Sequence, residues 1–287
     1  MLDLKITLKE IRPSLSASSI TTYDSILRNL HKRIYGKEPI ELKNFNKVKL
    51  ILEELKNLPV NRRKTILSAL TVLTDNKQYR DAMLDDIKEY NAEISKQKKT
   101  TSQKENWLEP EELKNKLALY QKNAELLYKK KIIGPNDLQE IQNFIILLLY
   151  SGEHFPPRRS KDLTDFRIGN INKHMDNWLD KNEMVYNSYK TAKTYGEQRI
   201  TVPIKVRNTL RKWFKINPTD YLLFDKNFEP LTAVKLNQRL NKIFDGRKIS
   251  VNQLRHTFLT EKYGDIGEDM EDMGSSINMA TTYIKKD

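Results

Sequence analysis

Hydrophobic residues recur at helical spacing through roughly the first hundred positions of the chain. Four segments carry this pattern: 16–36, 48–58, 61–75 and 81–94. In the first of them, Ile20, Leu27 and Leu30 fall on one helical face behind a run of serines that can cap the helix. Pro59 interrupts the pattern between the second and third segments. We therefore expect residues 1–97 to form a compact unit of four helices.

The pattern changes after a short polar stretch. Residues 98–106 are polar and basic, which predicts an interdomain linker. From residue 107 onward, helical spacing gives way near residue 166 to β-branched and aromatic residues with turn signals, and then returns. This order predicts two or three short antiparallel strands between helices. The expected fold is mostly α with a small antiparallel sheet: a helical domain at 1–97 and an α+β domain at 107–287.

Two features of the C-terminal region concern helix limits. Ser250 and Gln253 have the spacing of a capping box, so a helix is expected to begin there. The acidic stretch GDIGEDMED at 264–272 is unusual in a basic chain. We expect a solvated turn; the alternative is a segment that pairs with a basic DNA-binding channel until substrate arrives.

Charge narrows the range of partners. The 51 Lys and Arg residues outnumber 38 Asp and Glu, giving a net charge of +13, which favours a polyanion such as nucleic acid or an anionic membrane surface. Cysteine is absent, as fits a reducing intracellular setting. The longest apolar run, 144–150, is too short to span a bilayer, and the first residues lack the layout of a signal peptide. The expectation is a soluble intracellular protein that binds nucleic acid and no membrane.

Several chemistries find no motif in this chain. Its four histidines are scattered, without an HExxH spacing. Neither a Walker loop nor a GxGxxG is present, and no GxSxG hydrolase signature occurs. We therefore predict neither a metal nor a cofactor.

Phosphate chemistry has candidate residues. Val251, Leu254 and Phe258 define an apolar helix face that leaves Arg255 at its margin, where a guanidinium can grip a phosphate. Tyr283 could act as a covalent nucleophile on that phosphate. Taken by themselves, these residues allow a plainer interpretation, with Arg255 in a surface ion pair and Tyr283 as one of thirteen tyrosines.

The segments LRHTFLTEKYG and MGSSINMATTYIKK resemble the last two motif blocks of the tyrosine recombinases, the lambda-integrase family, and most closely those of large DNA viruses and virophages. FPPRRSKDL resembles the family's first arginine motif, with Arg159 paired to Asp162 and Arg158 as a possible substitute. YKTAKTYGEQRITVP resembles its β-hairpin lysine motif, which implies Lys190 as the catalytic lysine and Lys193 as the second choice.

The chain departs from the family pattern at two positions. NQLRH resembles the His-x-x-Arg motif, with Arg255 as the second arginine, but Asn252 stands where histidine is commonest. Gly274, or Ser275, occupies the place of the usual His or Trp. Asparagine can hydrogen-bond a phosphate oxygen but cannot take up a proton near neutrality.

The resemblance implies a function and partners. It implies site-specific recombination or integration through a 3′-phosphotyrosine on Tyr283, without metal or ATP. The implied partner is double-stranded DNA. The protein is expected to be a monomer in the absence of DNA and to form a tetramer on it. If the protein is viral, it is expected in the host cytoplasm or nucleus. A type IB topoisomerase and a catalytically decayed DNA-binding protein are the alternatives.

The N-terminal helices resemble the family's core-binding domain in arrangement. Candidate DNA-contacting residues are Arg62, Arg63 and Lys64 at a helix start, and Lys98 and Lys99 in the linker. A solvated helix end and a flexible tether are the alternatives for these two groups.

Overall fold

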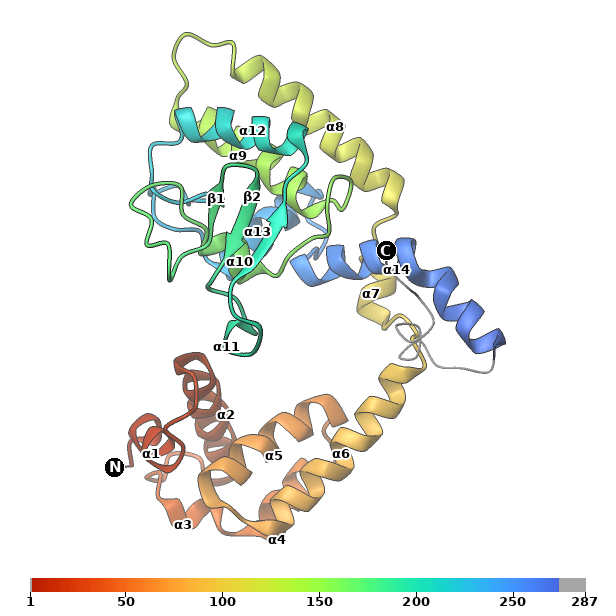
Figure 1. The fold of residues 1–287 in the computed structure, drawn as a ribbon. Coiled ribbons are helices and arrows are strands. Elements are labelled where there is room, and N and C mark those ends of the chain that lie inside the picture. The colour runs from red at the N-terminus through yellow and green to blue at the C-terminus, as the bar shows by residue number, and fades with distance from the viewer. Residues whose placement is uncertain (1, 274–287) are drawn as a thin grey trace. The chain divides into compact units, whose positions relative to one another are not determined.

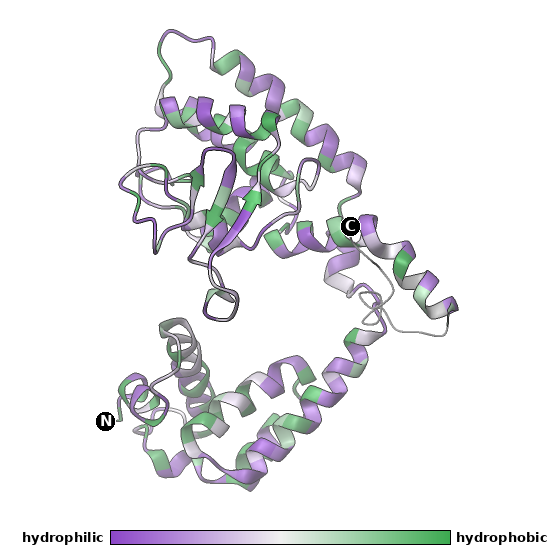
Figure 2. Ribbon diagram, in the orientation of Figure 1, coloured by the Kyte–Doolittle hydropathy of each residue, from purple (hydrophilic) through white to green (hydrophobic). Residues whose placement is uncertain are grey.

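Two separate hydrophobic cores divide the chain. The structure, a computed structural model, describes residues 2–273, and its two compact units meet in sequence between Lys99 and Thr100, inside the predicted linker. One core is built from the N-terminal helices and the other from the helices and strands that follow (Figure 1). In Figure 2, hydrophobic and hydrophilic residues alternate along helices such as α6 and α8, as expected of helices with one buried face.

The N-terminal unit is helical, as predicted. Its helices are α1 (Leu4–Ile11), α2 (Ala17–Tyr35), α3 (Leu42–Phe45), α4 (Val48–Leu55), α5 (Val60–Thr74) and α6 (Lys77–Ser95). Four of these correspond to the expected segments, while α1 and α3 are additional. Helix α1 forms because Asp3 caps its backbone N–H groups, with an Oδ1 distance of 2.9 Å to the nitrogen of Lys5, and because Leu4 and Leu8 are fully buried.

The second unit is helical around one small sheet. Its elements are α7 (Thr101–Glu105), α8 (Pro110–Leu127), α9 (Pro135–Tyr150), α10 (Ser160–Thr164), β1 (Trp178–Asp180), β2 (Glu183–Tyr186), α11 (Ala192–Tyr195), β3 (Gln198–Thr201), α12 (Ile204–Ile216), α13 (Ala233–Ile243) and α14 (Val251–Asp272). The three strands are antiparallel in the order β1-β2-β3. The predicted fold class, mostly α with a small antiparallel sheet, is confirmed.

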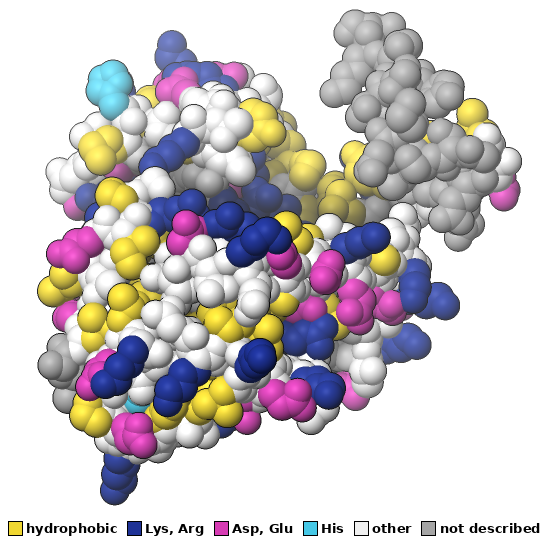
Figure 3. Space-filling model, turned by 90° about the horizontal axis from the view of Figure 1, so that it is seen from below, with side chains coloured by type: hydrophobic (Ala, Val, Ile, Leu, Met, Phe, Trp, Pro, Cys, Tyr) yellow, Lys and Arg dark blue, Asp and Glu magenta, His cyan; other side chains and the backbone are white. Residues whose placement is uncertain are grey.

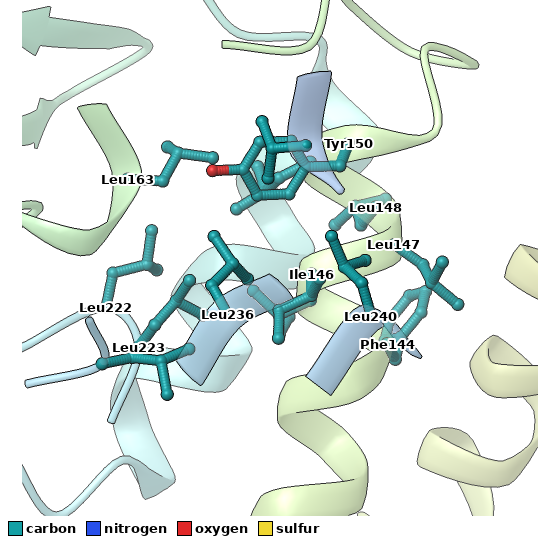
Figure 4. Close-up of a cluster of buried hydrophobic side chains, with 14 of the residues drawn as sticks. Phe144, Ile146, Leu147, Leu148, Tyr150, Leu163, Leu222, Leu223, Leu236 and Leu240 are labelled. Atoms are coloured by element: carbon teal, nitrogen blue, oxygen red, sulfur yellow. The ribbon is translucent and has the colours of Figure 1, made fainter. Parts of the chain in front are cut away.

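Helix α9 lies at the centre of the second unit. Its residues from Phe144 to Tyr150 are all buried, which explains why this stretch is apolar on every side. Figure 4 shows side chains of α9 packed among Leu163 of α10, Leu222 and Leu223 of the following loops, and leucines of α13. The core thus holds fixed both the carboxyl end of α9 and the segment that follows it.

The polar stretch between the units is partly ordered. Residues 98–106 were expected to be a linker, and they contain α7, because Thr100 and Gln103 cap its first turn reciprocally at 3.2 and 2.8 Å. The Asn106 Oδ1 atom then accepts a hydrogen bond from the backbone nitrogen of Lys248 at 2.8 Å. The end of the linker is therefore attached to the second unit.

Helix α14 begins as predicted and ends later than predicted. Ser250 Oγ accepts from the backbone nitrogen of Gln253 at 3.2 Å, so the predicted start of the helix is confirmed. The expected turn at 264–272 is wrong, since α14 continues to Asp272. Extending an existing helix needs no new nucleus, and the cost of a glycine such as Gly264, about 1 kcal/mol, does not end it.

None of the helices within residues 2–273 combines the length and the hydropathy that crossing a lipid bilayer requires.

Candidate active site

A cavity of about 350 Å³ collects most of the predicted arginine site. The segment after α9, the start of α10, β3 and α14 all contribute to it. Its lining residues are Phe155, Pro156, Pro157, Arg158, Arg159, Asp162, Ile200 and Arg255. The two arginine motifs, far apart in sequence, therefore meet around one cavity of the second unit.

Arg158 is held on several sides. Its Nε donates to Asp162 Oδ2 at 2.8 Å, and its Nη1 donates to Gln198 Oε1 at 3.0 Å. The guanidinium carbon lies 4.2 Å from the ring centre of Tyr186 and 5.5 Å from that of Tyr189. The expected pairing of Asp162 with Arg159 is wrong, because the neighbouring arginine reaches the carboxylate instead.

Arg159 has a different environment. It is the N-cap of α10 in extended conformation, and its carbonyl oxygen accepts from the backbone nitrogen of Asp162 at 3.1 Å. Its side chain is exposed and has no carboxylate partner among the residues that the structure describes. Its guanidinium is therefore available to a ligand in the cavity.

Arg255 brings a third guanidinium to the cavity. It is half-buried on α14, beside the buried Leu254. Its pKa is lowered, first by burial and then by repulsion from Arg159 and Arg158, while Asp162 acts in the opposite direction. Three cations converging on one carboxylate leave an excess of positive charge, which a bound anion would neutralise.

Two buried oxygen atoms lie close to these arginines without a hydrogen-bond partner among the described residues. They are Asp162 Oδ1 and the hydroxyl oxygen of Tyr150. Burial raises the pKa of Asp162 despite the opposing effect of Arg158, and burial raises the pKa of Tyr150 well above its usual value. Asp162 therefore has a free acceptor on the side not used by Arg158.

The predicted lysines are close in sequence to Ile200, which lines the cavity, but they do not line it themselves. Lys190 and Lys193 are exposed in the connection between β2 and β3, which also contains α11. Tyr189, next to Lys190, packs against Arg158. Asn252 is exposed on α14 and does not line the cavity either. Gly274, Ser275 and Tyr283 lie outside the described residues.

The predicted basic residues of the N-terminal unit have distinct roles in the structure. Arg62 is exposed, whereas Arg63 donates to both carboxylate oxygens of buried Asp86, at 2.9 and 2.8 Å from Nε. The Lys64 ammonium lies 3.1 Å from the ring centre of Tyr90. Figure 3 shows Lys and Arg side chains interspersed with Asp and Glu on the surface seen from below.

The linker lysines complete the predicted set. Both Lys98 and Lys99 have exposed side chains and precede α7. Their contact with DNA stays a prediction.

The residues that hold Arg158 were not predicted. Tyr186 and Gln198 are direct partners across the β2–β3 ladder, so both reach Arg158 from the same end of the sheet. A sequence signal for them would require the strand register, which the short strands do not specify. Within the described part of the chain, no three His, Asp or Glu side chains lie close enough to hold a metal ion.

No family model and no curated protein matches the chain. Solved structures are distantly similar. The lambda integrase fragment 75–356, crystallised as a dimer bound to a COC′ core site, is 14% identical over 97% of this chain and 92% of its own, with a TM-score of 0.46. A lambda integrase tetramer bound to a Holliday junction is 12% identical over 98% and 76%, with a TM-score of 0.45. XerA recombinase is 13% identical over 90% and 82%, with a TM-score of 0.37.

Proposed function

We propose that this chain is a site-specific DNA recombinase of the tyrosine type, an integrase closest to those of large DNA viruses and virophages. The observation that supports this most directly is the meeting of Arg159 and Arg255 around one cavity, whose lining also contains the buried Asp162. A guanidinium pair in which neither member forms an ion pair within the described residues suits a phosphodiester, because each guanidinium can donate two parallel hydrogen bonds to its oxygens.

The residues divide the reaction among them. Arg159 and Arg255 neutralise the charge that develops on the scissile phosphate. Tyr283 loses its phenolic proton to solvent as its Oη forms the new bond to phosphorus and the bond to the 5′ oxygen breaks. Lys190 donates a proton to that leaving oxygen and regains one from solvent. The product is a 3′-phosphotyrosine and a free 5′ hydroxyl. The 5′ hydroxyl of a partner strand then attacks the phosphotyrosine, releases Tyr283 and joins the two strands. Because the phosphotyrosyl bond conserves the energy, neither metal nor ATP is required.

Asp162 and Arg158 position the guanidinium groups that contact the phosphate. Arg158 binds Oδ2 of Asp162 and leaves Oδ1 as an acceptor for a guanidinium that has engaged the phosphate. Asn252 would add a hydrogen bond to a phosphate oxygen and no proton transfer. The assembly on double-stranded DNA is a tetramer joining two sites, formed from monomers.

The test is covalent capture. Wild-type protein is incubated with a nicked suicide duplex carrying its target site, found by selection from a random-sequence library, and SDS-resistant adducts are scored. We expect an adduct with wild type and none with Tyr283→Phe. Absence of an adduct despite DNA binding would favour the decayed binding protein suggested by Asn252. Relaxation of supercoiled DNA without two-duplex complexes would favour the topoisomerase.

A further inference from the structure

A second cavity of the same unit has no part in the proposed recombination site. It encloses about 780 Å³ and is lined by residues of α8, α9 and α13 and of the loop 225–231. We call it the Arg239 groove, after the arginine of α13 that lines it. Asn143 and Asn241 line it too, from α9 and α13. It shares no lining residue with the arginine cavity of the candidate active site.

Arg239 is half-buried, its Nη1 atom is fully buried, and no ion pair joins it to a carboxylate of the described residues. Its Nη2 donates to the side-chain oxygen of Gln139, and its buried Nη1 has no acceptor among the described residues. Burial lowers the pKa of Arg239 to about 10, and Glu140 and Asp225 oppose this only in part. A buried guanidinium that has no counter-ion is costly, because its desolvation is not repaid.

The neighbouring groups do not supply that counter-ion. Asp225 is already held by Lys235 and by the backbone nitrogens of Asn227 and Glu229, at 2.8 and 3.1 Å from Oδ1. Its carboxylate is thus occupied on both oxygens. Glu140, the other carboxylate of the lining, is exposed and forms no ion pair with Arg239 among the described residues. Four cations of the lining (Lys226, Lys235, Arg239 and Lys242) thus face two carboxylates, so the groove has an excess of positive charge.

Further polar groups of the groove are also free. The side-chain oxygens of Asn143 and Asn241 are buried without a partner in the described part of the chain. The Asn241 amide can turn over and present its NH₂ as a donor. Asn143 already donates its NH₂ to Glu140 Oε2 at 3.4 Å, so its oxygen is the group it offers to a ligand. Lys226 and Lys242 line the groove with exposed ammonium groups that have no ion pair among residues 2–273.

We propose that the Arg239 groove binds a small ligand through an oxyanion group, a phosphate or a carboxylate. Nη1 of Arg239 anchors the anion, the two asparagine amides contact it or its neighbouring polar atoms, and the exposed lysines raise its local concentration. This site is independent of the recombinase proposal, because none of these side chains takes part in strand transfer.

The experiment measures anion binding to the full chain by isothermal titration calorimetry. Sodium phosphate and sodium acetate are titrated separately at constant ionic strength, with chloride as the balancing anion. The titrations use the Arg159→Gln/Arg255→Gln variant, so that the arginine cavity does not contribute. We expect saturable binding with a Kd on the order of 1 mM for one of the two anions. The anion that binds shows whether the groove prefers a phosphate or a carboxylate.

Variants then locate the site. Adding Arg239→Gln should weaken binding by about tenfold or more, whereas adding Lys215→Gln, an exposed charge on α12 outside the groove, should leave it unchanged. If Arg239→Gln does not fold, Arg239→Lys provides the same comparison, because it keeps the charge and loses the Nη1 donor. The proposal would be overturned if neither phosphate nor acetate gave a saturable binding isotherm. It would also be overturned if the Arg239 variants bound the anion as tightly as the protein with Arg239 intact.

The two proposals fail separately. In an otherwise wild-type chain, Arg239→Gln should form the covalent DNA adduct as wild type does. A wild type that forms no adduct and still binds the anion would refute the recombinase proposal alone.

Discussion

Arg158 donates from Nε to Oδ2 of Asp162 at 2.8 Å, and thereby neutralises the carboxylate that the motif assigns to Arg159. The Arg158 side chain is 18% exposed and that of Asp162 only 2%. Two consecutive arginines thus have different environments, one enclosed by its partners and the other open to the cavity. We infer that Arg158 positions the site and that Arg159 contacts the substrate.

This division predicts opposite results for two alanine variants. Arg158→Ala leaves a buried carboxylate without its partner, so the free energy of unfolding should fall by about 3 kcal/mol. Arg159→Ala removes an exposed side chain without an ion pair and should change stability by less than about 0.5 kcal/mol, while adduct formation falls by about a hundredfold or more. Urea unfolding and the suicide-duplex assay measure the two quantities.

A pH series adds a second readout for Arg158→Ala. Burial already raises the pKa of Asp162, and loss of Arg158 raises it further. The stability deficit should therefore be largest above this pKa and shrink as pH falls and the carboxyl group becomes protonated. Lys161→Ala is the matched control, since Lys161 of α10 pairs at 3.7 Å with Asp165, which follows the helix, but is exposed. Equal deficits in both variants at all pH values would contradict the assignment.

The sequence predicted local features better than it predicted partners. Ser250 caps α14 and the β-branched stretch forms the sheet, because both depend on residues a few positions apart. The pairing of Asp162 was wrong because Arg158 is selected by Tyr186 and Gln198, which reach it only once β2 and β3 are in register. Local motifs contain no information about that register.

The same contrast holds at the ends of elements. The acidic stretch 264–272 was expected to be a solvated turn, yet α14 continues through it, because the preceding turns had already formed the helix. The sequence around Arg239 is rich in lysine, a pattern typical of a solvent-exposed helix face. The Arg239 Nη2 atom donates to the side chain of Gln139, a hundred residues away in sequence, and only the folded chain brings these two groups together.

Gly152 should be intolerant of a side chain. Its φ is +82°, and a Cβ there would lie 2.5 Å from Cδ2 of Phe258 on α14. Backbone strain of about 1 kcal/mol and overpacking of about 2 kcal/mol predict that Gly152→Ala lowers the free energy of unfolding by about 3 kcal/mol. Because α14 also presents Arg255, adduct formation should fall even at temperatures where the variant is folded.

Gly246→Ala isolates the backbone contribution. Gly246 has a similar φ of +88°, and a Cβ there would meet no atom within 4 Å. It should therefore cost only about 1 kcal/mol, with no effect on adduct formation. If thermal and urea unfolding showed the two variants to be equally stable, the proposed contact with Phe258 would be ruled out as the cause.

Asp225 should make stability depend on pH in the acid range. Lys235 and the backbone N–H groups of Asn227 and Glu229 lower the pKa of Asp225 below its usual value. Its stabilising contribution is therefore complete above the unfolded-state pKa of about 3.9 and is lost as pH falls through the lower folded-state value. Asp225→Asn should be less stable by about 2 kcal/mol at pH 7 and approach wild type as pH falls through the folded-state pKa of Asp225.

The control for Asp225 is Asp245→Asn. Asp245 pairs with Lys116 at 2.7 Å, but its side chain is 80% exposed. Its stability difference from wild type should stay within about 0.5 kcal/mol over the whole pH range. An Asp225→Asn deficit that stays constant from pH 7 down to the acid limit of the titration would mean that its carboxylate charge is not what stabilises the loop.

Arg62 and Arg63 are adjacent in the predicted DNA-contacting group, and the structure separates them. Arg63 is paired with buried Asp86, so Arg63→Ala should cost about 3 kcal/mol of unfolding free energy and leave DNA affinity unchanged when folded protein is titrated. Arg62 is exposed, so Arg62→Ala should keep wild-type stability, weaken DNA binding, and reduce the slope of log K against log salt by about 1. Fluorescence anisotropy at several salt concentrations gives both quantities. A salt slope changed by Arg63→Ala and not by Arg62→Ala would show that Arg63 leaves Asp86 to reach the phosphate, since only a cation that displaces counter-ions alters that slope.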